Sequence, residues 1–205
     1  MARGQAKKVF VGAIGADNPV FAQILGICST LAVTNNFRNT VVMSLGVLFT
    51  TSLSGFTVSL LRKKIPGRVR MMAETLIIAS YVIIVDIVLK AYLPDISRQL
   101  GPYVGLIITN CIIMGRAEAF ALNNPPGISL IDGVASGIGY SYVLLVIAFF
   151  RELMGSGTIF GFQVMGDWWT NWAIMVMPPG AFFMLAIFIW VVKGVFLKEK
   201  EEAKA

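Results

Sequence analysis

The sequence contains no histidine and only two cysteines, Cys28 and Cys111. The lack of histidine removes the commonest proton shuttle and metal ligand at neutral pH, together with any haem held by that side chain. Zinc sites and iron–sulfur clusters generally take four cysteine or histidine ligands, so two cysteines without a CxxC motif cannot complete such a site. Three interpretations stay open: inert core thiols, a disulfide, or half of a metal site that a second polypeptide completes.

Charged residues are also scarce, at 14% of the chain, where a soluble domain carries about 25%. Hydrophobic residues make up 57% of the 205 residues, and the mean hydropathy is +0.77. A chain of this composition needs lipid as its solvent. The net charge of +6 does not indicate a nucleic-acid partner, because the basic cluster RKKIPGRVR at residues 62–70 lies between apolar runs and is interpreted as a topology anchor.

The hydrophobic runs predict an all-α membrane protein with six transmembrane helices. A helix needs about 20 apolar residues to cross a bilayer. The approximate spans are 19–34, 41–61, 69–89, 101–121, 133–150 and 173–192. Polar residues interrupt the first span, in CSTLAVTNN, and the fourth, in TNC and GRAE. Weak segments in matching positions of two halves indicate broken helices that meet near mid-membrane.

Basic residues predict the orientation of these spans. Twelve lysines and arginines fall on the side that holds both termini, and four fall on the opposite side. The positive-inside rule places the richer side in the cytoplasm. We therefore expect a cytoplasmic N-terminal segment at 1–18, a single integral membrane domain at 19–197 and a charged cytoplasmic tail at 198–205.

One short motif occurs in both halves of the membrane domain. PVFAQILGIC at residues 19–28 and PYVGLIITNC at residues 102–111 each pair a proline with a cysteine, at an offset of 102 − 19 = 83 residues. A phenylalanine follows each cysteine at the same distance, at Phe37 and Phe120. The two motifs therefore indicate an internal repeat.

Three spans in each half make this repeat an inverted one. Repeat 1 covers about 19–93 and repeat 2 about 101–197. An inverted repeat brings equivalent points together around an axis in the membrane plane, so Cys28 and Cys111 are predicted to be neighbours near mid-depth. Two glycine pairs at GxxxG spacing are interpreted as tight helix packing, Gly101 with Gly105 and Gly133 with Gly137.

Several charged residues fall inside the predicted spans, where each costs about 2.5–3.5 kcal/mol on insertion scales. They are Glu74, Asp86, Arg116, Glu118 and Asp132. Asp86 and Lys90 are four residues apart and can pair along one helix. Arg116 and Glu118 are two residues apart, so they cannot share a helical face and each needs another partner.

Longer stretches carry a family resemblance. LGICSTLAVTNN and GLIITNCIIMGRAEAFA resemble the signature segments of the paired D and E membrane subunits of sodium-translocating NADH:quinone oxidoreductase (Nqr) and of their Rnf counterparts. IVDIVLKAYLPDISRQL, Asp132 in LIDG, and FFRELMGSGTIFG resemble the D type in particular. The serine after Cys28 favours this type over its Rnf counterpart, where proline is expected.

The resemblance implies a [2Fe-2S] cluster inside the membrane, with two ligands from each of two homologous subunits. Cys28 and Cys111 match the ligand positions, and a homologous E-type subunit would supply the other two. The family complex also contains A, B, C and F subunits in a bacterial inner membrane, and it exports Na⁺. FAD, FMN and riboflavin are expected on other subunits only. In agreement, GIGYSY lacks the strand–turn–helix context of a dinucleotide site, and SGTIF departs from the family's covalent-flavin motif.

The resemblance also suggests roles for the charged residues. Asp86 and Asp132 match acidic positions suspected of handling sodium, and the alternative is that they are helix-end or interfacial charges. Arg116 would supply positive potential near an anionic cluster or form a structural ion pair, and Glu118 belongs to the same candidate group. Gly26 and Asn110 flank the cysteines where a broken helix exposes backbone N–H groups, which can tune a cluster.

Two other functions remain as alternatives. The equivalent Rnf subunit would serve a ferredoxin:NAD oxidoreductase. A small secondary transporter or channel would also suit an inverted repeat with broken helices. The cysteines discriminate, because a transporter has no need for iron.

Overall fold

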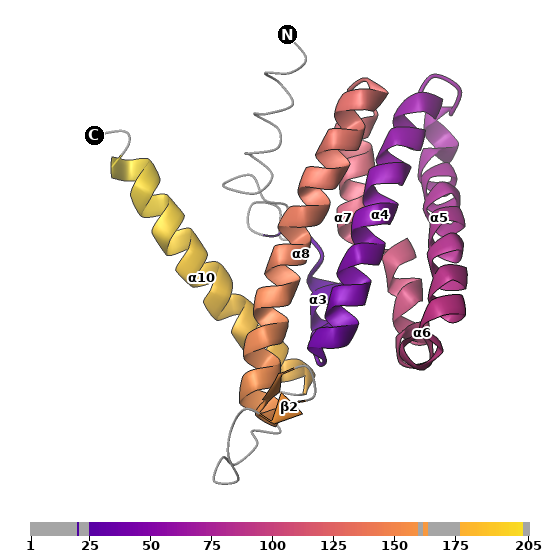
Figure 1. Cartoon of the computed structure of the whole chain (residues 1–205). Helices are drawn as coiled ribbons and strands as arrows, with labels where there is room; N and C mark the ends of the chain where they lie inside the picture. The colour runs from indigo at the N-terminus through magenta and orange to yellow at the C-terminus, as the bar shows by residue number, and fades with distance from the viewer. Residues whose placement is uncertain (1–19, 21–24, 160–161, 164–176, 203–205) are drawn as a thin grey trace.

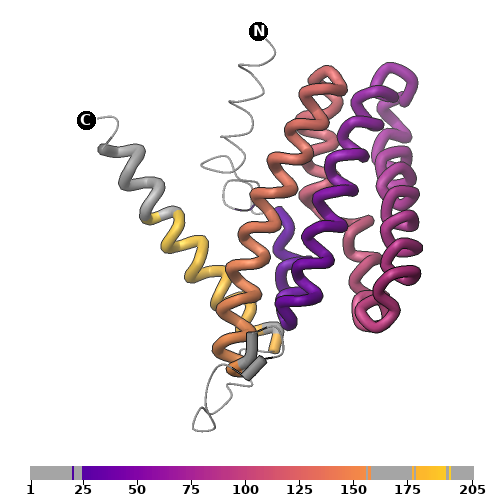
Figure 2. Tube along the Cα trace, viewed as in Figure 1, coloured from indigo at the N-terminus to yellow at the C-terminus, as the bar shows by residue number. Residues whose placement is uncertain are grey.

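The structure, a computed structural model, describes residue 20 and residues 25–159, 162–163 and 177–202, and the other residues are the thin grey trace in Figure 1. Figure 2 shows the Cα path in the same view. The described part is helical apart from one short hairpin, which confirms the predicted all-α class (Figure 1). The helices are α3 (Ile27–Val33), α4 (Phe37–Leu61), α5 (Arg70–Tyr92), α6 (Pro94–Ile108), α7 (Cys111–Arg116), α8 (Pro126–Ser156) and α10 (Pro178–Glu202). The 3₁₀ turn η1 (Gly67–Val69), the π-helical turn η2 (Ala117–Ala121) and the antiparallel strands β1 (Thr158–Ile159) and β2 (Phe162–Gln163) are the other described elements.

Helices α4 and α8 pack closely against each other at the centre of the molecule (Figure 1). The glycines of α8 allow this approach. A Cβ atom on Gly133 would lie 2.9 Å from the Ser52 Cα, and one on Gly137 would lie 2.7 Å from Leu48 Cδ1. The predicted tight packing is confirmed for this glycine pair. Helix α4 belongs to the predicted first repeat and α8 to the second, so their contact joins the two repeats.

Polar side chains within α4 are satisfied by the helix itself. The hydroxyls of Thr50, Thr51 and Ser52 donate to carbonyl oxygens four residues earlier, at 2.8, 2.6 and 2.7 Å respectively. Such bonds leave no free donor facing hydrocarbon at these three positions. This local bonding explains how a helix with many hydroxyls can still cross a membrane.

Helix α5 lies at the edge of the bundle, on the opposite side from α10 (Figure 1). Its buried residues are Glu74, Ile78 and Val82, one for each helical turn, so a narrow stripe faces the neighbouring helices. Large apolar side chains cover much of the rest, and Leu76 and Ile87 are 71% and 60% exposed. In a chain with this hydropathy, that surface is suited to lipid or another membrane subunit.

The fourth predicted span is interrupted, as expected. Helix α6 ends at Ile108, Asn110 adopts an extended conformation, and α7 begins at Cys111. The chain then continues through η2. A Cβ atom added to Gly101 or Gly105 of α6 would meet no described atom within 4 Å, so close packing at this GxxxG pair is not seen within the described residues.

Four helical stretches are long and apolar enough to cross a membrane. They are Phe37–Leu61, Gly67–Tyr92, Pro94–Ala121 and Pro126–Gly155, and a shorter apolar helix covers Pro179–Val192. These five correspond to the predicted second to sixth spans, and α8 extends beyond the predicted 133–150 at both ends. Residues 19 and 21–24 of the predicted first span lie outside the described residues, and α3 is the one helix described in full there. The count of six therefore stays a prediction.

The connections alternate between the two ends of the bundle. The loop from α4 to α5, the loop from η2 to α8 and the C-terminal end of α10 lie on the same side (Figure 1). Arg62 Nη1 ties two of these connections together, because it donates to the carbonyl oxygens of Leu122 at 3.3 Å and Asn124 at 3.0 Å. The basic loop that predicts orientation is thus anchored on the bundle.

The other end of the bundle is held by two buried charges of α8. Glu152 Oε2 accepts the backbone N–H of Phe37 at 2.5 Å, at the start of α4. Arg151 is 2% exposed, and its Nη1 donates to Thr34 Oγ1 just after α3. Arg151 is one of the four basic residues predicted on the side opposite both termini. In the structure it also fastens α8 to the segment between α3 and α4.

Candidate functional site

The first cysteine turn, defined here as residues 26–29, begins α3. Gly26 precedes the helix with φ 85°, a left-handed conformation that favours glycine. Its carbonyl oxygen accepts bonds from the hydroxyls of Ser29 at 3.2 Å and Thr30 at 2.8 Å. Cys28 follows in the first helical turn and is exposed. The backbone bend therefore ends with a thiol that is available to a partner.

The second cysteine turn, residues 109–112, begins α7 by a different device. Asn110 is the N-cap of this helix, and its side-chain oxygen accepts the backbone N–H of Ile112 at 3.2 Å. Asparagine is among the preferred residues at this position. Cys111 is the first residue of α7, and it too is free and exposed. The predicted helix break is confirmed at Asn110, between α6 and α7, and Gly26 directly precedes the start of α3.

The two cysteine turns contact each other directly. Asn110 Nδ2 donates to Ser29 Oγ at 3.3 Å, so the residue after Cys28 is bonded to the residue before Cys111. The backbone of Gly26 lies so close that an added Cβ would be 2.8 Å from Ile112 Cδ1. Segments 83 residues apart therefore meet at equivalent points, as the inverted repeat predicts.

The donor set at this junction is limited to two thiols. Among the described residues there is no group of three or more cysteine, aspartate or glutamate side chains that could hold a metal ion. Two exposed thiols on adjoining turns have the chemistry of half of a four-thiolate iron–sulfur site. They fit a shared cluster whose other ligands come from another polypeptide, and they do not fit a complete site on this chain.

The threonines near Cys28 bond within α3 and its neighbours. Thr30 bonds to the Gly26 carbonyl, and Thr34 Oγ1 donates to the Thr30 carbonyl at 2.6 Å. Asn35 lines a pocket of about 390 Å³ with Asn39 and residues of α6. The threonines thus satisfy backbone groups freed by the helix break.

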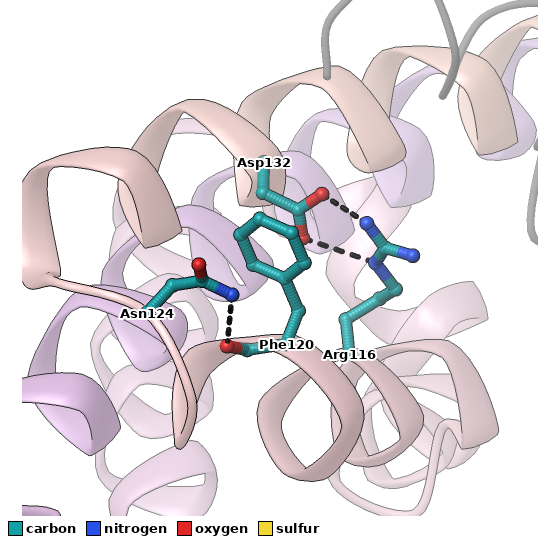
Figure 3. A network of polar contacts seen from close by, with 4 residues as sticks. All are labelled: Arg116, Phe120, Asn124 and Asp132. Atoms are coloured by element: carbon teal, nitrogen blue, oxygen red, sulfur yellow. Dashed lines mark hydrogen bonds and ion pairs between the residues drawn. The ribbon is translucent and has the colours of Figure 1, made fainter. Parts of the chain in front are cut away.

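Arg116 and Asp132 form a buried two-bond ion pair between α7 and α8 (Figure 3). Arg116 Nε donates to Asp132 Oδ2 at 3.0 Å, and its Nη2 bonds the other carboxylate oxygen. The Asp132 side chain is only 2% exposed. The guanidinium also lies over the Phe120 ring, 5.3 Å from its centroid, and the Phe120 carbonyl accepts from Asn124 Nδ2 at 3.0 Å (Figure 3). A fork-to-fork pair of this kind fixes geometry as well as charge.

Glu118 has a different partner from Arg116, as the spacing predicts. Its carboxylate lies 3.6 Å from Arg70 Nη2, at the start of α5, and both side chains are partly exposed. The π-helical turn η2 begins between Arg116 and Glu118 and directs them to different helices. The pairing of Arg116 with Asp132 was not predicted from the sequence. The opposite charges of these two residues in consecutive spans could have indicated it.

No described hydrogen bond or ion pair joins the remaining charges in the spans to the cysteine turns. Asp86 bonds Lys90 at 2.6 Å along α5, which confirms the predicted i, i+4 pair, and both side chains are partly exposed. Glu74 is 1% exposed, and its Oε1 has no hydrogen-bond partner among the described residues. No described contact joins Asp86 to Asp132, so the structure does not bring the two candidate sodium residues together.

One residue at the junction was not expected from the sequence. Tyr140 of α8 is fully buried, and its hydroxyl bonds Ser29 Oγ. Its ring lies against the first cysteine turn, because an added Cβ on Gly26 would be 2.8 Å from Tyr140 Cε2. Tyr140 belongs to GIGYSY, the stretch that lacks the context of a dinucleotide site. A buried tyrosine in an apolar span needs a polar partner for its hydroxyl, so the sequence could have indicated that Tyr140 bonds to a distant polar residue.

Comparison with known proteins agrees with the resemblance carried by these segments. The family model described as "Rnf-Nqr subunit, membrane protein" matches residues 6–189. A relative from Pseudoalteromonas translucida (strain TAC 125), named as the D subunit of Na(+)-translocating NADH-quinone reductase, is 44% identical over 206 residues, covering 98% of each chain. The chain is therefore a multi-pass membrane protein that belongs to the Rnf-Nqr family of membrane subunits.

Proposed function

We propose that this chain is the D-type subunit of a sodium-pumping NADH:quinone oxidoreductase and carries half of the ligand set of an intramembrane [2Fe-2S] cluster. The observation that carries the proposal is the contact between the two cysteine turns, through Ser29 and Asn110. It brings the two turns together while both free thiols remain exposed. The similarity to a D-type subunit over nearly the whole chain supports the same assignment.

The second half of the ligand set belongs to a partner of the same kind. A homologous E-type subunit, with its own two cysteines, would cover the exposed thiols of Cys28 and Cys111. The other proposed partners are the A, B, C and F subunits, which would carry the flavins FAD, FMN and riboflavin. The cluster, when bound, supplies one-electron transfer. The residues of this chain hold the thiolates, fix the direction in which they point and keep the surroundings apolar.

The membrane position follows from the same assignment. We place the chain in a bacterial inner membrane, with residues 1–18 and the tail at 198–205 in the cytoplasm and one membrane domain between them. The two connections tied by Arg62 then face the cytoplasm. A cytoplasmic reporter fused after Ala205 should be active. Activity of a periplasm-only reporter at the same position would reverse this orientation.

The acidic residues are the proposed contribution of this chain to sodium export. Asp132 is buried, and Arg116 engages both of its carboxylate oxygens, so a sodium ion would compete with the arginine for this carboxylate. Arg116 also places a positive charge five residues after Cys111, where it would stabilise an anionic cluster. Asp86 is partly exposed on α5, and Glu118 binds Arg70 near one end of the bundle.

The test of the function is a metal analysis of the whole complex. Iron, acid-labile sulfide and the electron paramagnetic resonance (EPR) spectrum are measured in complexes with Cys28→Ser or Cys111→Ser. Loss of one cluster with retention of the other cofactors is the expected result. The matched control is Tyr142→Phe, an exposed change on α8 that should leave all three readouts unchanged.

The same preparations separate the alternatives. Normal iron content and turnover in both cysteine variants would favour a transporter or channel over an electron relay. An Rnf subunit would instead support ferredoxin-dependent reduction of NAD. The expected activity is NADH-driven quinone reduction that exports Na⁺.

A further inference from the structure

Tyr140 lies on α8, outside both cysteine turns, yet its hydroxyl reaches the point where the turns meet. The side chain is 0% exposed, and the ring packs on Gly26. Helix α8 is one of the two central helices of the bundle, so it provides a rigid support that neither short helix has. A hydroxyl placed here can therefore tie the turns to the centre of the molecule.

Three hydrogen bonds meet at the Ser29 hydroxyl, and the bond to Tyr140 is the one that α8 contributes. Ser29 Oγ donates to the Gly26 carbonyl at 3.2 Å and accepts from Asn110 Nδ2 at 3.3 Å. A serine hydroxyl has one proton and two lone pairs. The third bond, to the Tyr140 hydroxyl, can run in either direction, because each of the two hydroxyls can donate or accept. Phenylalanine could not replace this bond.

The bonded network continues through Asn110 to the second turn. The side-chain oxygen of Asn110 accepts the N–H of Ile112 at 3.2 Å. The connected bonds therefore extend from the Gly26 carbonyl to the Ile112 amide. Cys28 lies next to Ser29, and Cys111 lies between Asn110 and Ile112. Both cysteines are thus attached to backbone that the network holds.

We propose that Tyr140 is the positioning residue of the cysteine pair: its hydroxyl locks Ser29 and Asn110 together and so sets the separation and direction of the two thiols. That the separation serves a cluster rests on the proposed function. The locking itself depends only on the contacts of this chain. A site of two thiols on two short helices needs such support, because ligands are held precisely only when a surrounding layer of bonds fixes them.

The first measurement does not require a cluster. The full-length chain, produced in membranes without the other subunits, is treated with a short bifunctional thiol reagent, and the rate of linking Cys28 to Cys111 is followed. Tyr140→Phe should lower this rate about fivefold, the size expected when one buried hydrogen bond is lost. Tyr142→Phe, two residues away and 60% exposed, should leave the rate unchanged.

Ser29→Ala provides a second, independent variant, because it removes the same junction without changing the aromatic packing. It should slow the linking reaction to a similar extent, and the double variant should be no slower than either single one, since the three groups act as a unit. If Tyr140→Phe fails to accumulate in the membrane, Ser29→Ala alone decides the matter. Unchanged linking rates in both variants would overturn the proposal.

The second measurement uses the assembled complex. Tyr140→Phe should keep the cluster but broaden its EPR lines and shift its midpoint potential, whereas Tyr142→Phe should reproduce the parent spectrum. A parent spectrum in Tyr140→Phe, with unchanged linking rates, rejects the positioning role and leaves the proposed function standing. Absence of any such cluster in the parent complex rejects the proposed function, and the linking rates still decide whether Tyr140 positions the cysteines.

Discussion

The first and second cysteine turns each place a thiol in the first turn of a short helix, but the chain reaches that point by different chemistry. At the first turn, a glycine with φ 85° bends the backbone, and no side chain caps the helix. At the second, an asparagine in extended conformation uses its side chain to cap the helix. The two segments therefore place a cysteine in the first turn of a short helix with different residues before it. The shared requirement is this placement of the cysteine, and the type of the preceding residue can vary.

The two halves also diverge after the cysteines. Phe37 and Phe120 are equivalent by the 83-residue offset, yet Phe37 is the first residue of α4, whereas Phe120 lies within η2. The second half continues helically through η2 to Ala121 before its long helix starts, while α3 ends at Val33. Among the described residues, the two repeats are therefore alike at the cysteine turns and differ by the time they reach Phe37 and Phe120. Substitutions at the two turns and around them test how far this likeness extends.

The largest effect should be the same at both turns. If the turns are halves of one ligand set, Cys28→Ser and Cys111→Ser should each remove the whole cluster signal, and the double variant should lose no more. EPR and quinone reduction of the assembled complexes provide the measurement. A partial signal in only one of the single variants would contradict the equivalence of the two turns.

The Arg116–Asp132 pair distinguishes the second half from the first, because Val33 occupies the position of Arg116 in the first repeat at the same offset (116 − 83 = 33). Arg116→Leu leaves a buried carboxylate and should cost about 3–5 kcal/mol, measured as loss of thermal stability and accumulation. The double change Arg116→Leu with Asp132→Leu should recover most of this loss. Equal instability of the single and double variants would show that the charges themselves are required.

Gly26→Ala should harm the first turn through two effects. The left-handed φ costs about 1–3 kcal/mol for a residue with a side chain, and contacts at 2.8 Å with Ile112 and Tyr140 add an overpacking cost of about 1–3 kcal/mol. Thermal unfolding of the purified complex reports the sum. Gly127→Ala, at a position with no atom within 4 Å among the described residues, is the matched control and should change little.

Asn110→Ala should be milder than Gly26→Ala. It removes a cap worth about 0.5–2 kcal/mol and one bond to Ser29, but it introduces no clash. Thermal unfolding measured beside Gly26→Ala gives the comparison directly. A larger loss for Asn110→Ala would mean that the cap, rather than the backbone bend, dominates the stability of the junction.

Asp86→Asn should have the smallest effect on stability. Its bond to Lys90 is a partly exposed pair along one helix, and such pairs contribute about 0.2–1 kcal/mol. Sodium-dependent turnover supplies the second readout. If Asp86 handles sodium, the sodium concentration for half-maximal activity rises while the unfolding temperature stays within error. An unchanged sodium dependence would leave Asp86 as a helix-end charge.

Much of this architecture could be predicted from local sequence. Hydropathy located the spans from α4 onward, the polar residues near Cys111 located the break between α6 and α7, and the odd number of spans predicted that the two cysteines approach. Gly133 and Gly137 were correctly assigned to tight packing. These features depend on residues close together in the chain or on a simple symmetry.

What could not be predicted depends on pairs brought together by tertiary packing. Tyr140 reaches Ser29 over 111 residues, and Arg151 reaches Thr34 over 117. Neither spacing has any periodicity that would mark it. The Arg116–Asp132 pair was missed for the same reason, because the two residues are 16 positions apart on different helices and only tertiary packing brings them together.

The turn η2 has a consequence for how this segment tolerates change in length. A π-helical turn holds one residue more than an α-helical turn, and each residue advances a helix by about 100° of rotation. Deleting one residue from η2 would therefore rotate α7 by roughly a quarter of a circle relative to the chain that follows. This rotation would matter more than the small loss of length. Arg116 would swing away from Asp132, and the strain would pass along α7 to Cys111. The number of residues in η2 therefore sets the rotation of α7 and with it the direction of the Cys111 thiol. The length of η2 matters more than the identity of its side chains.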